Sequence, residues 1–425
     1  MPLAAASWSW EGPLSLRIAL RADVRFASGA PFEAEDVCAT LRALADPARG
    51  SPHRTLVTAI GACEPLSPKE VRLRLGHERA TMLTDLELPI LRRDEATSAR
   101  RPEGGLDGLG PYALARADGG SFELRARPGG ALPEPARDLN VRVVRDENAR
   151  ALRLLAGRAD VVPNGLSAPL LGAIAARGAL VRSRPGANLT YLLPHHERVP
   201  FRDPRARRAL SLGVDRERLA RTLFEGRAQP ARSFLPPGSW AYPADAAPLL
   251  HDAGAAARLF AELGRPSATL LVSTDRARGV LARAIAQDLV DAGLRVEVVT
   301  LELGALVQRL TAGDYELALL QMPEITEPQL LEWFFHSRFI PDRGGVGANR
   351  ARYRNAAVDD RLARAALELD RERRRALFHE ALGLMGDDLP VVPLFHEDQI
   401  VALSARAAAF MPSAEGRWLG LASVP

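Results

Sequence analysis

The segment from residue 268 to residue 322 constrains the fold most, because it alternates three apolar strand patterns with two helical ones. The strand patterns read ATLLVST, LRVEVVTL and DYELALLQM, and the helical patterns between them read GVLARAIAQDLVDAG and LGALVQRLTAG. This β-α-β-α-β order predicts a sheet with parallel neighbouring strands and right-handed crossovers. Such sheets bind ligands beyond the carboxyl ends of their strands, so we expect a site around residues 321–333.

The rest of the chain also mixes strands and helices. Residues 14–26 and 70–75 alternate apolar and polar side chains, as half-buried strands do. A helical pattern covers residues 359–389, and residues 390–396 have the composition of a buried strand. Residues 119–138 are rich in Gly and Pro, and we expect a loop there. Together these patterns predict an α/β protein.

An arginine-rich stretch, VPFRDPRARRALSLGVDRERL at residues 199–219, raises the question of a nucleic-acid partner. Asp203 before Pro204, and Asp215 further along, are typical of helix starts, because an aspartate carboxylate accepts hydrogen bonds from the free N–H groups of the first turn. We therefore interpret the arginines as the solvated faces of two short helices. The stretch has no interleaved stacking aromatics, so no nucleic-acid partner is expected.

Composition excludes several classes of protein. The formal net charge is only +4 over 425 residues, which does not favour a nucleic-acid or membrane-surface partner. No apolar run approaches the roughly 18 residues of a membrane span, and no secretory signal is visible at the start. Two cysteines, Cys38 and Cys63, are too few for a disulfide framework or a zinc site. They could form one bridge or remain two buried thiols.

Local motifs of catalysis do not occur in the sequence. The phosphate-binding loop, the H-E-x-x-H zinc motif, the G-x-S-x-G elbow and the dinucleotide fingerprint are all lacking. The neighbouring His195 and His196 point opposite ways if the segment is extended, so we interpret them as a surface pair and expect no metal site. We expect neither a cofactor nor an enzymatic activity.

Six motifs, in order along the chain, carry a resemblance to a known family. The first is LAAASWSWEGPLSLRIALRADVRFASGAPFEAEDV, which is similar to the family pattern LA-x-x-W … F-x-L-R-x-x-V-x-F-x-x-G-x-P-x-x-A-x-D-V. The others are GLGPYAL, RDENARALRLLAGRADVV, the arginine-rich stretch with its P-x-x-D-x-R core, RYRNAAVDDRLARA and LPVVPLF. On these motifs the chain resembles the family 5 extracellular solute-binding proteins, the peptide, nickel and oligosaccharide receptors of bacterial ABC importers, along nearly its full length.

The resemblance implies a periplasmic-binding-protein-like fold of the type II, large peptide-binding class, in which two α/β lobes close on a ligand at a double hinge. The chain would cross between lobes near residues 193–199 and return near residues 391–396. Lobe one would comprise residues 1–196 with 393–425, and lobe two residues 197–392. Family members have some tens of residues before the first motif, so the resemblance implies a lobe one shortened by its first strand.

The resemblance also indicates binding residues. Where many relatives have W-x-x-D-Y-P-D-P, this chain has QMPEITEP at residues 321–328. In peptide-binding relatives an acidic group of this region pairs with the N-terminal ammonium of the ligand, and here Glu327 or Glu324 could do so, with Gln321 or Met322 in the place of the tryptophan. The alternative is that both glutamates are exposed loop carboxylates. Three further residues are candidates. Trp240 and Trp333 could form walls of the pocket, with core packing as the alternative, and Asn349 could face the ligand.

The function implied is a receptor without catalytic activity. It would capture a small solute, expected to be a peptide, and deliver it as a monomer to the membrane permease subunits of an ABC importer. Its place would be the periplasm, or the cell surface as a lipoprotein, if a leader exists upstream. The alternative is a cytoplasmic solute-sensing or regulatory domain on the same fold, without transport.

Overall fold

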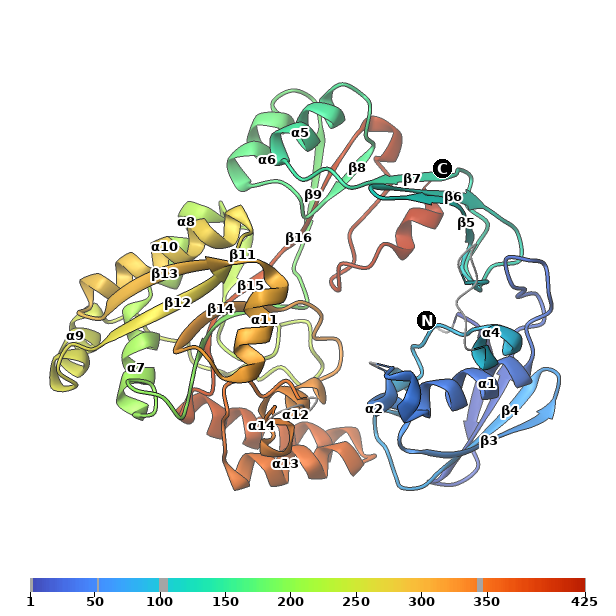
Figure 1. Ribbon diagram of the computed structural model, residues 1–425, viewed down its shortest axis with the longest axis horizontal. Coiled ribbons are helices and arrows are strands. Elements are labelled where there is room, and N and C mark those ends of the chain that lie inside the picture. Colours follow the sequence, from blue (N-terminus) through green and yellow to red (C-terminus); the bar gives the residue numbers. More distant parts are fainter. Residues whose placement is uncertain (1–2, 52, 99–105, 342–346, 425) are drawn as a thin grey trace. The chain divides into compact units, whose positions relative to one another are not determined.

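The computed structural model describes residues 3–51, 53–98, 106–341 and 347–424 (Figure 1), and the chain forms two compact units. Unit 1 comprises Met1–Asp160, Leu403–Met411 and Trp418–Pro425. Unit 2 comprises Val161–Ala402 and Pro412–Arg417. The lobes expected from the resemblance are defined by their movement on a ligand and not by compactness. Their boundary at residue 196 therefore stays a prediction.

Unit 1 is built on an antiparallel four-stranded sheet with the order β1-β2-β4-β3 and a three-stranded sheet with the order β5-β6-β7. Strands β2 and β4 alternate as predicted, with Leu16, Ile18, Val71 and Leu73 turned into the core. The elements are β1 (Ala5–Trp10), β2 (Ser15–Leu20), α1 (Ala34–Ala45), α2 (Arg54–Val57), β3 (Ile60–Ser67), β4 (Glu70–Leu75), α3 (Met82–Asp85), α4 (Arg93–Thr97), β5 (Tyr112–Asp118), β6 (Ser121–Ala126), β7 (Leu139–Arg142) and α5 (Glu147–Leu155), with short 3-10 turns at Pro47–Arg49, Ala405–Ala407 and Leu419–Ser423.

Cys38 and Cys63 form a disulfide that links helix α1 to strand β3. The bridge spans 25 residues, and a loop of that length restricts the unfolded chain enough to add about 3 kcal/mol to the free energy of unfolding. We expect the C38A/C63A variant to lose about that amount in urea unfolding of the protein. Dithiothreitol should destabilise the parent protein and leave the variant unchanged, and an equal effect on both would contradict the prediction.

Unit 2 is built on a six-stranded sheet with the order β11-β15-β10-β14-β12-β13, beside a small three-stranded sheet with the order β8-β16-β9 (Figure 1). Strand β12 pairs parallel with β13 and β14, which confirms the predicted β-α-β-α-β segment. The elements are β8 (Val161–Pro163), α6 (Ala168–Ala175), β9 (Leu180–Arg184), β10 (Leu189–Pro194), α7 (Pro204–Gly213), α8 (Arg216–Leu223), β11 (Ala228–Pro230), α9 (Ala253–Glu262), β12 (Ser267–Ser273), α10 (Arg276–Asp291), β13 (Arg295–Leu301), α11 (Leu303–Ala312), β14 (Leu317–Met322), α12 (Leu330–Phe335), a 3-10 turn at Ser337–Phe339, α13 (Ala356–Leu367), α14 (Arg371–Asp388), β15 (Val392–Glu397) and β16 (Gln399–Leu403).

The large sheet is covered on both faces, because its strands send successive side chains into two separate hydrophobic cores. In β10, Tyr191 packs with side chains of α11 to α14 on one face, and the next residue, Leu192, packs with side chains of α7, α9 and α10 on the other. A sheet buried on both faces leaves only its edges and strand ends open to solutes. The strand ends are therefore where a site can form.

The two expected helices in the arginine-rich stretch are confirmed as α7 and α8, capped by Asp203 and Asp215. The expectation that all the arginines are solvated was wrong for Arg207 and Arg216, which are buried. Arg216 donates hydrogen bonds to the carbonyl oxygens of Pro393 and Ser211, each at 2.8 Å. A guanidinium can be buried where backbone carbonyls accept its protons, and helical periodicity does not reveal those carbonyls.

Three further predictions need correction. The expected loop at 119–138 contains strand β6, which pairs with β5 and β7. The helical block at 359–389 is two helices, because α13 ends at Leu367 and Asp370 caps α14 by accepting a hydrogen bond from Arg373 N–H. The expectation of a surface pair of histidines was wrong for His195, which is buried with its ring centroid 5.0 Å from that of Tyr315, whereas His196 is half-buried.

Candidate functional site

The carboxyl ends of strands β12, β13 and β14 lie at the same end of the six-stranded sheet. Strand β10 runs antiparallel to both β14 and β15, so β15 runs in the same direction as β14 and also terminates there. The residues brought together there are Gln321 near the end of β14, Thr190 near the start of β10 and Glu397 at the end of β15. The first turn of α10, which follows β12, supplies Arg278.

These four side chains form one polar network. The amide of Gln321 donates to the Thr190 hydroxyl at 3.1 Å, and that hydroxyl donates to Glu397. Arg278 donates to both carboxylate oxygens of Glu397, one of them at 3.0 Å. Burial alone would lower the pKa of Arg278, but the facing Glu397 carboxylate raises it, so the guanidinium stays charged. The network joins three strands and a helix N-terminus at the end of the sheet where ligands of such sheets bind.

Of this network the sequence indicated only Gln321. Thr190, Arg278 and Glu397 lie in separate segments, and none of them belongs to a local motif. The sequence does contain a signal for Arg278, because this residue lies in the first turn of the helix that follows a parallel strand. It did not distinguish Arg278 from the other arginines of that helix.

Glu324 follows β14 directly and is half-exposed, with 37% of its side chain accessible. Its Oε1 accepts a hydrogen bond from Arg417 Nε at 2.5 Å. The backbone beside it is attached to the start of the β10 segment, because Ile325 N–H donates to the Ala187 carbonyl at 2.6 Å. Glu324 therefore stands on a loop held by a main-chain hydrogen bond, three residues after Gln321 of the polar network.

Glu327 has different surroundings. Its carboxylate accepts from Arg374 Nη2 at 2.7 Å, and Arg374 is buried in helix α14. The Arg374 guanidinium also lies 5.3 Å from the Trp240 ring centroid, and the ring of Trp240 meets Phe378 edge to face at 5.8 Å. Glu327 and Trp240 thus take part in the packing around α14. A direct contact of either with a ligand stays a prediction.

Trp333 and Asn349 also differ in exposure. Trp333, in α12, is 41% exposed and contacts the Phe334 ring. Asn349 is fully buried. Its amide donates to the carbonyl oxygens of Phe335, His336 and Tyr353, and its Oδ1 accepts from Tyr353 N–H at 3.1 Å. These bonds use both the N–H groups and the oxygen of the Asn349 side chain, and a ligand contact of Asn349 stays a prediction. Trp333, by contrast, offers an accessible apolar face.

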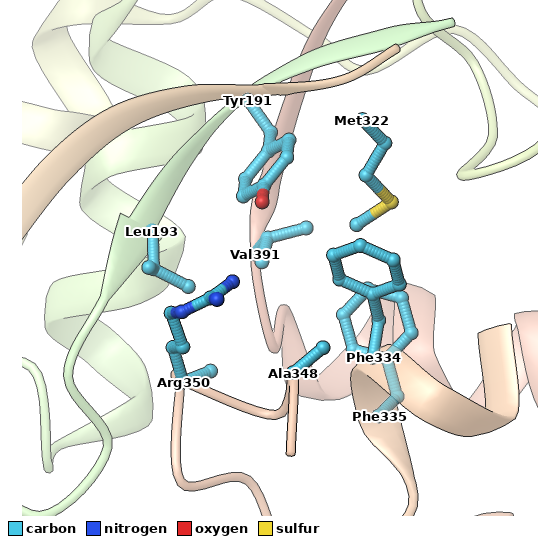
Figure 2. A pocket seen from close by; sticks show the side chains of 9 residues that line it. Tyr191, Leu193, Met322, Phe334, Phe335, Ala348, Arg350 and Val391 are labelled. Atoms are coloured by element: carbon cyan, nitrogen blue, oxygen red, sulfur yellow. The ribbon is translucent and has the colours of Figure 1, made fainter. Parts of the chain in front are cut away.

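A small cavity lies beneath β10 and β14, between Tyr191, Met322, Phe334 and Arg350 (Figure 2). Figure 2 shows the Tyr191 hydroxyl directed into the space that these side chains surround. The cavity measures about 10 Å³, which is room for about one water molecule. It is too small for a solute, and the candidate site remains the end of the sheet that carries the polar network.

Among residues 3–51, 53–98, 106–341 and 347–424, no group of three or more His, Cys, Asp or Glu side chains has the arrangement of a metal site. None of the helices in these same ranges is long and apolar enough to cross a bilayer.

Comparison with known proteins identifies the fold and the family. The profile of the bacterial extracellular solute-binding proteins, family 5 Middle, matches residues 1–339. The probable di/tripeptide-binding protein 5 of Pseudomonas aeruginosa (strain UCBPP-PA14) is 27% identical over an alignment of 434 positions, and the match covers 93% of this chain and 81% of that protein.

Two solved structures share the fold. The oligopeptide-binding protein AppA from Bacillus subtilis, in complex with a nonapeptide, superposes with a TM-score of 0.85 at 18% identity, over 99% of this chain and 88% of that one. The periplasmic binding protein DppA from Helicobacter pylori, in complex with the peptide STSA, gives a TM-score of 0.84 at 21% identity, over 100% and 88%. The expected α/β fold of the two-lobed solute-binding class is confirmed. The chain therefore belongs to the bacterial extracellular solute-binding proteins of family 5.

Proposed function

We propose that this protein is the solute-binding receptor of an ABC importer and that its solute is a short peptide held by its N-terminal ammonium at Glu324. Relatives named for di- and tripeptide binding support the class of ligand. The observation that carries the choice of residue is the contrast between two carboxylates. Glu324 is half-exposed beyond the carboxyl end of β14, whereas Glu327 is paired with a buried arginine.

The surroundings of Glu324 support a role in recognition. A charge-assisted hydrogen bond between an ammonium and a carboxylate is about twice as strong as a neutral one. Gln321 lies three residues before Glu324 in the chain, and its side-chain carbonyl oxygen can accept a hydrogen bond from a peptide N–H. Trp333 offers an accessible apolar face. We propose these three residues, Glu324, Gln321 and Trp333, as ligand contacts.

We infer binding without chemical turnover, by a monomer that delivers its peptide to the permease subunits in the membrane. The family and the relatives are binding proteins, which supports the first point. The Cys38–Cys63 disulfide favours an oxidising compartment, which supports a periplasmic location and counts against a cytoplasmic sensor.

We further propose that lobe one (residues 1–196 with 393–425) and lobe two (residues 197–392) close on the peptide through the segments at 193–199 and 391–396. A ligand that contacts both lobes favours the closed form by its difference in affinity for the two forms. Small-angle scattering should then detect compaction when peptide is added.

Calorimetric titration with the dipeptide Ala-Ala, the tripeptide Ala-Ala-Ala and their N-acetylated forms tests the proposal. Losing a hydrogen bond to a charged group costs about 1.5 to 3 kcal/mol, so we expect E324Q to weaken binding of the free peptides by about tenfold to a hundredfold. N-acetylation should weaken binding to the parent protein by a similar factor and should add little in E324Q.

E327Q is the matched control, because it neutralises the neighbouring glutamate that is paired with Arg374. Equal binding of free and acetylated peptides by the parent protein, or no binding of any peptide, would refute the assignment of Glu324.

A further inference from the structure

The Glu324 carboxylate already has a cationic partner within the chain. Arg417 Nε donates to Glu324 Oε1 at 2.5 Å, across 93 residues of sequence. Both side chains are partly accessible, 42% for Arg417 and 37% for Glu324. A solute can therefore reach both groups of this pair.

The backbone brings these two side chains together through a single residue. The carbonyl of Ala187 accepts a hydrogen bond from Ile325 N–H at 2.6 Å, and the N–H of Ala187 donates to the Ala414 carbonyl at 2.7 Å. The loop that carries Glu324 and the segment that carries Arg417 are thus held on opposite sides of the chain just before β10. Their proximity follows from main-chain bonds, which constrain it more than two flexible side chains could.

A tight turn sets the position of Arg417. Its N–H donates to the Ser413 hydroxyl at 3.0 Å, and Gly416 N–H donates to the Ser413 carbonyl at 3.1 Å. Gly416 has a φ of 77°, and a Cβ there would lie 2.9 Å from Gln399 Oε1. A φ of this sign favours glycine, so the turn that places Arg417 depends on Gly416.

From this geometry we propose that Arg417 is a specificity-determining residue. Its guanidinium forms an ion pair with the Glu324 carboxylate until the ammonium of a peptide replaces it. The inference rests on the proposed function, because it takes Glu324 as the ammonium site. A ligand with a cationic end recovers the electrostatic interaction that the guanidinium gives up. A solute with a neutral end cannot, so the pair disfavours neutral solutes and moderates the affinity for peptides.

The consequence is that removing Arg417 strengthens peptide binding. An exposed ion pair contributes up to about 1 kcal/mol, which corresponds to about a fivefold change in the dissociation constant. We expect R417A and R417Q to bind Ala-Ala and Ala-Ala-Ala about fivefold more tightly than the parent protein in calorimetric titration. R417K keeps the charge and should bind nearly as the parent does.

A double variant separates this inference from the proposed function. In E324Q/R417A the gain should disappear, because the inference has the guanidinium act on peptide binding through the Glu324 carboxylate. N-acetylated peptides should gain about as much as free peptides in R417A, because the cost of displacing the guanidinium is removed for them as well. If E324Q weakens binding while R417A and R417Q leave it unchanged or weaken it, Glu324 keeps its role and the inference about Arg417 is wrong. If E324Q has no effect, or no variant binds any of the peptides, both are wrong. Thermal unfolding of each variant checks that the turn still folds.

Discussion

Replacing Glu397 with alanine is expected to lower the free energy of unfolding by about 1.5 to 3 kcal/mol, because it removes hydrogen bonds to the charged, partly buried Arg278. Arg278 would lose both hydrogen bonds to the carboxylate, and the Thr190 hydroxyl would lose its acceptor. The side chains of Arg278 and Glu397 are only 24% and 15% accessible, so water can replace the carboxylate only in part. Urea unfolding of unit 2, followed by circular dichroism, measures the effect.

The matched control removes both charges. Replacing a buried ion pair with apolar residues of similar size is often neutral or stabilising, so R278M/E397M should recover most of the stability lost in E397A. A double variant R278M/E397M that loses as much stability as R278M and E397M together would show that the two side chains act independently, which contradicts the network. E397A with unchanged stability would do the same.

Acidification from pH 7.5 to pH 5.0 is expected to remove about 2 kcal/mol of stability for each of His195 and His196, about 4 kcal/mol together. Burial lowers the pKa of His195 to about 4 and that of His196 to about 3, whereas in the unfolded chain each titrates near its ordinary value of about 6.5. Between these values the unfolded state binds more protons than the folded state, so stability falls as the pH decreases through this window. Above pH 6.5 the contribution is fully present.

Two variants test this dependence on pH. Each replaces one histidine with a side chain that does not titrate in this range and that can still form one of its hydrogen bonds. In H195N the amide oxygen can accept from Glu197 N–H as His195 Nδ1 does, and in H196Q the amide can donate to the Pro390 carbonyl as His196 Nε2 does. Each variant should flatten the dependence of stability on pH by about 2 kcal/mol over this range. A parent slope that neither substitution changes would place the titrating groups elsewhere in the chain.

The sequence predicted most where neighbours in space are also neighbours along the chain. The β-α-β-α-β segment, the caps Asp203 and Asp215, and the alternation of β2 and β4 all depend on residues within a few turns of one another. The motifs that carry the family resemblance also follow one another in order, and the profile match confirms them. The expected location of the site, at the carboxyl ends of the parallel strands, stays a prediction.

Prediction was less successful where a distant segment decides what a side chain contacts. Arg216 looked solvated because periodicity does not show the Pro393 carbonyl, 177 residues away, that accepts its proton. The helical pattern at 359–389 did not show the break before Asp370, because charged residues fit a helix and a helix cap equally well.

By itself the sequence determined the family and the α/β class, since each depends on local order along the chain. The tertiary structure alone decided which charges meet: Glu324 with Arg417, Glu327 with Arg374, and Glu397 with Arg278. The partners in these pairs lie 93, 47 and 119 residues apart. Electrostatic interaction depends on distance in space and on burial, and neither is written in the spacing of residues along a chain.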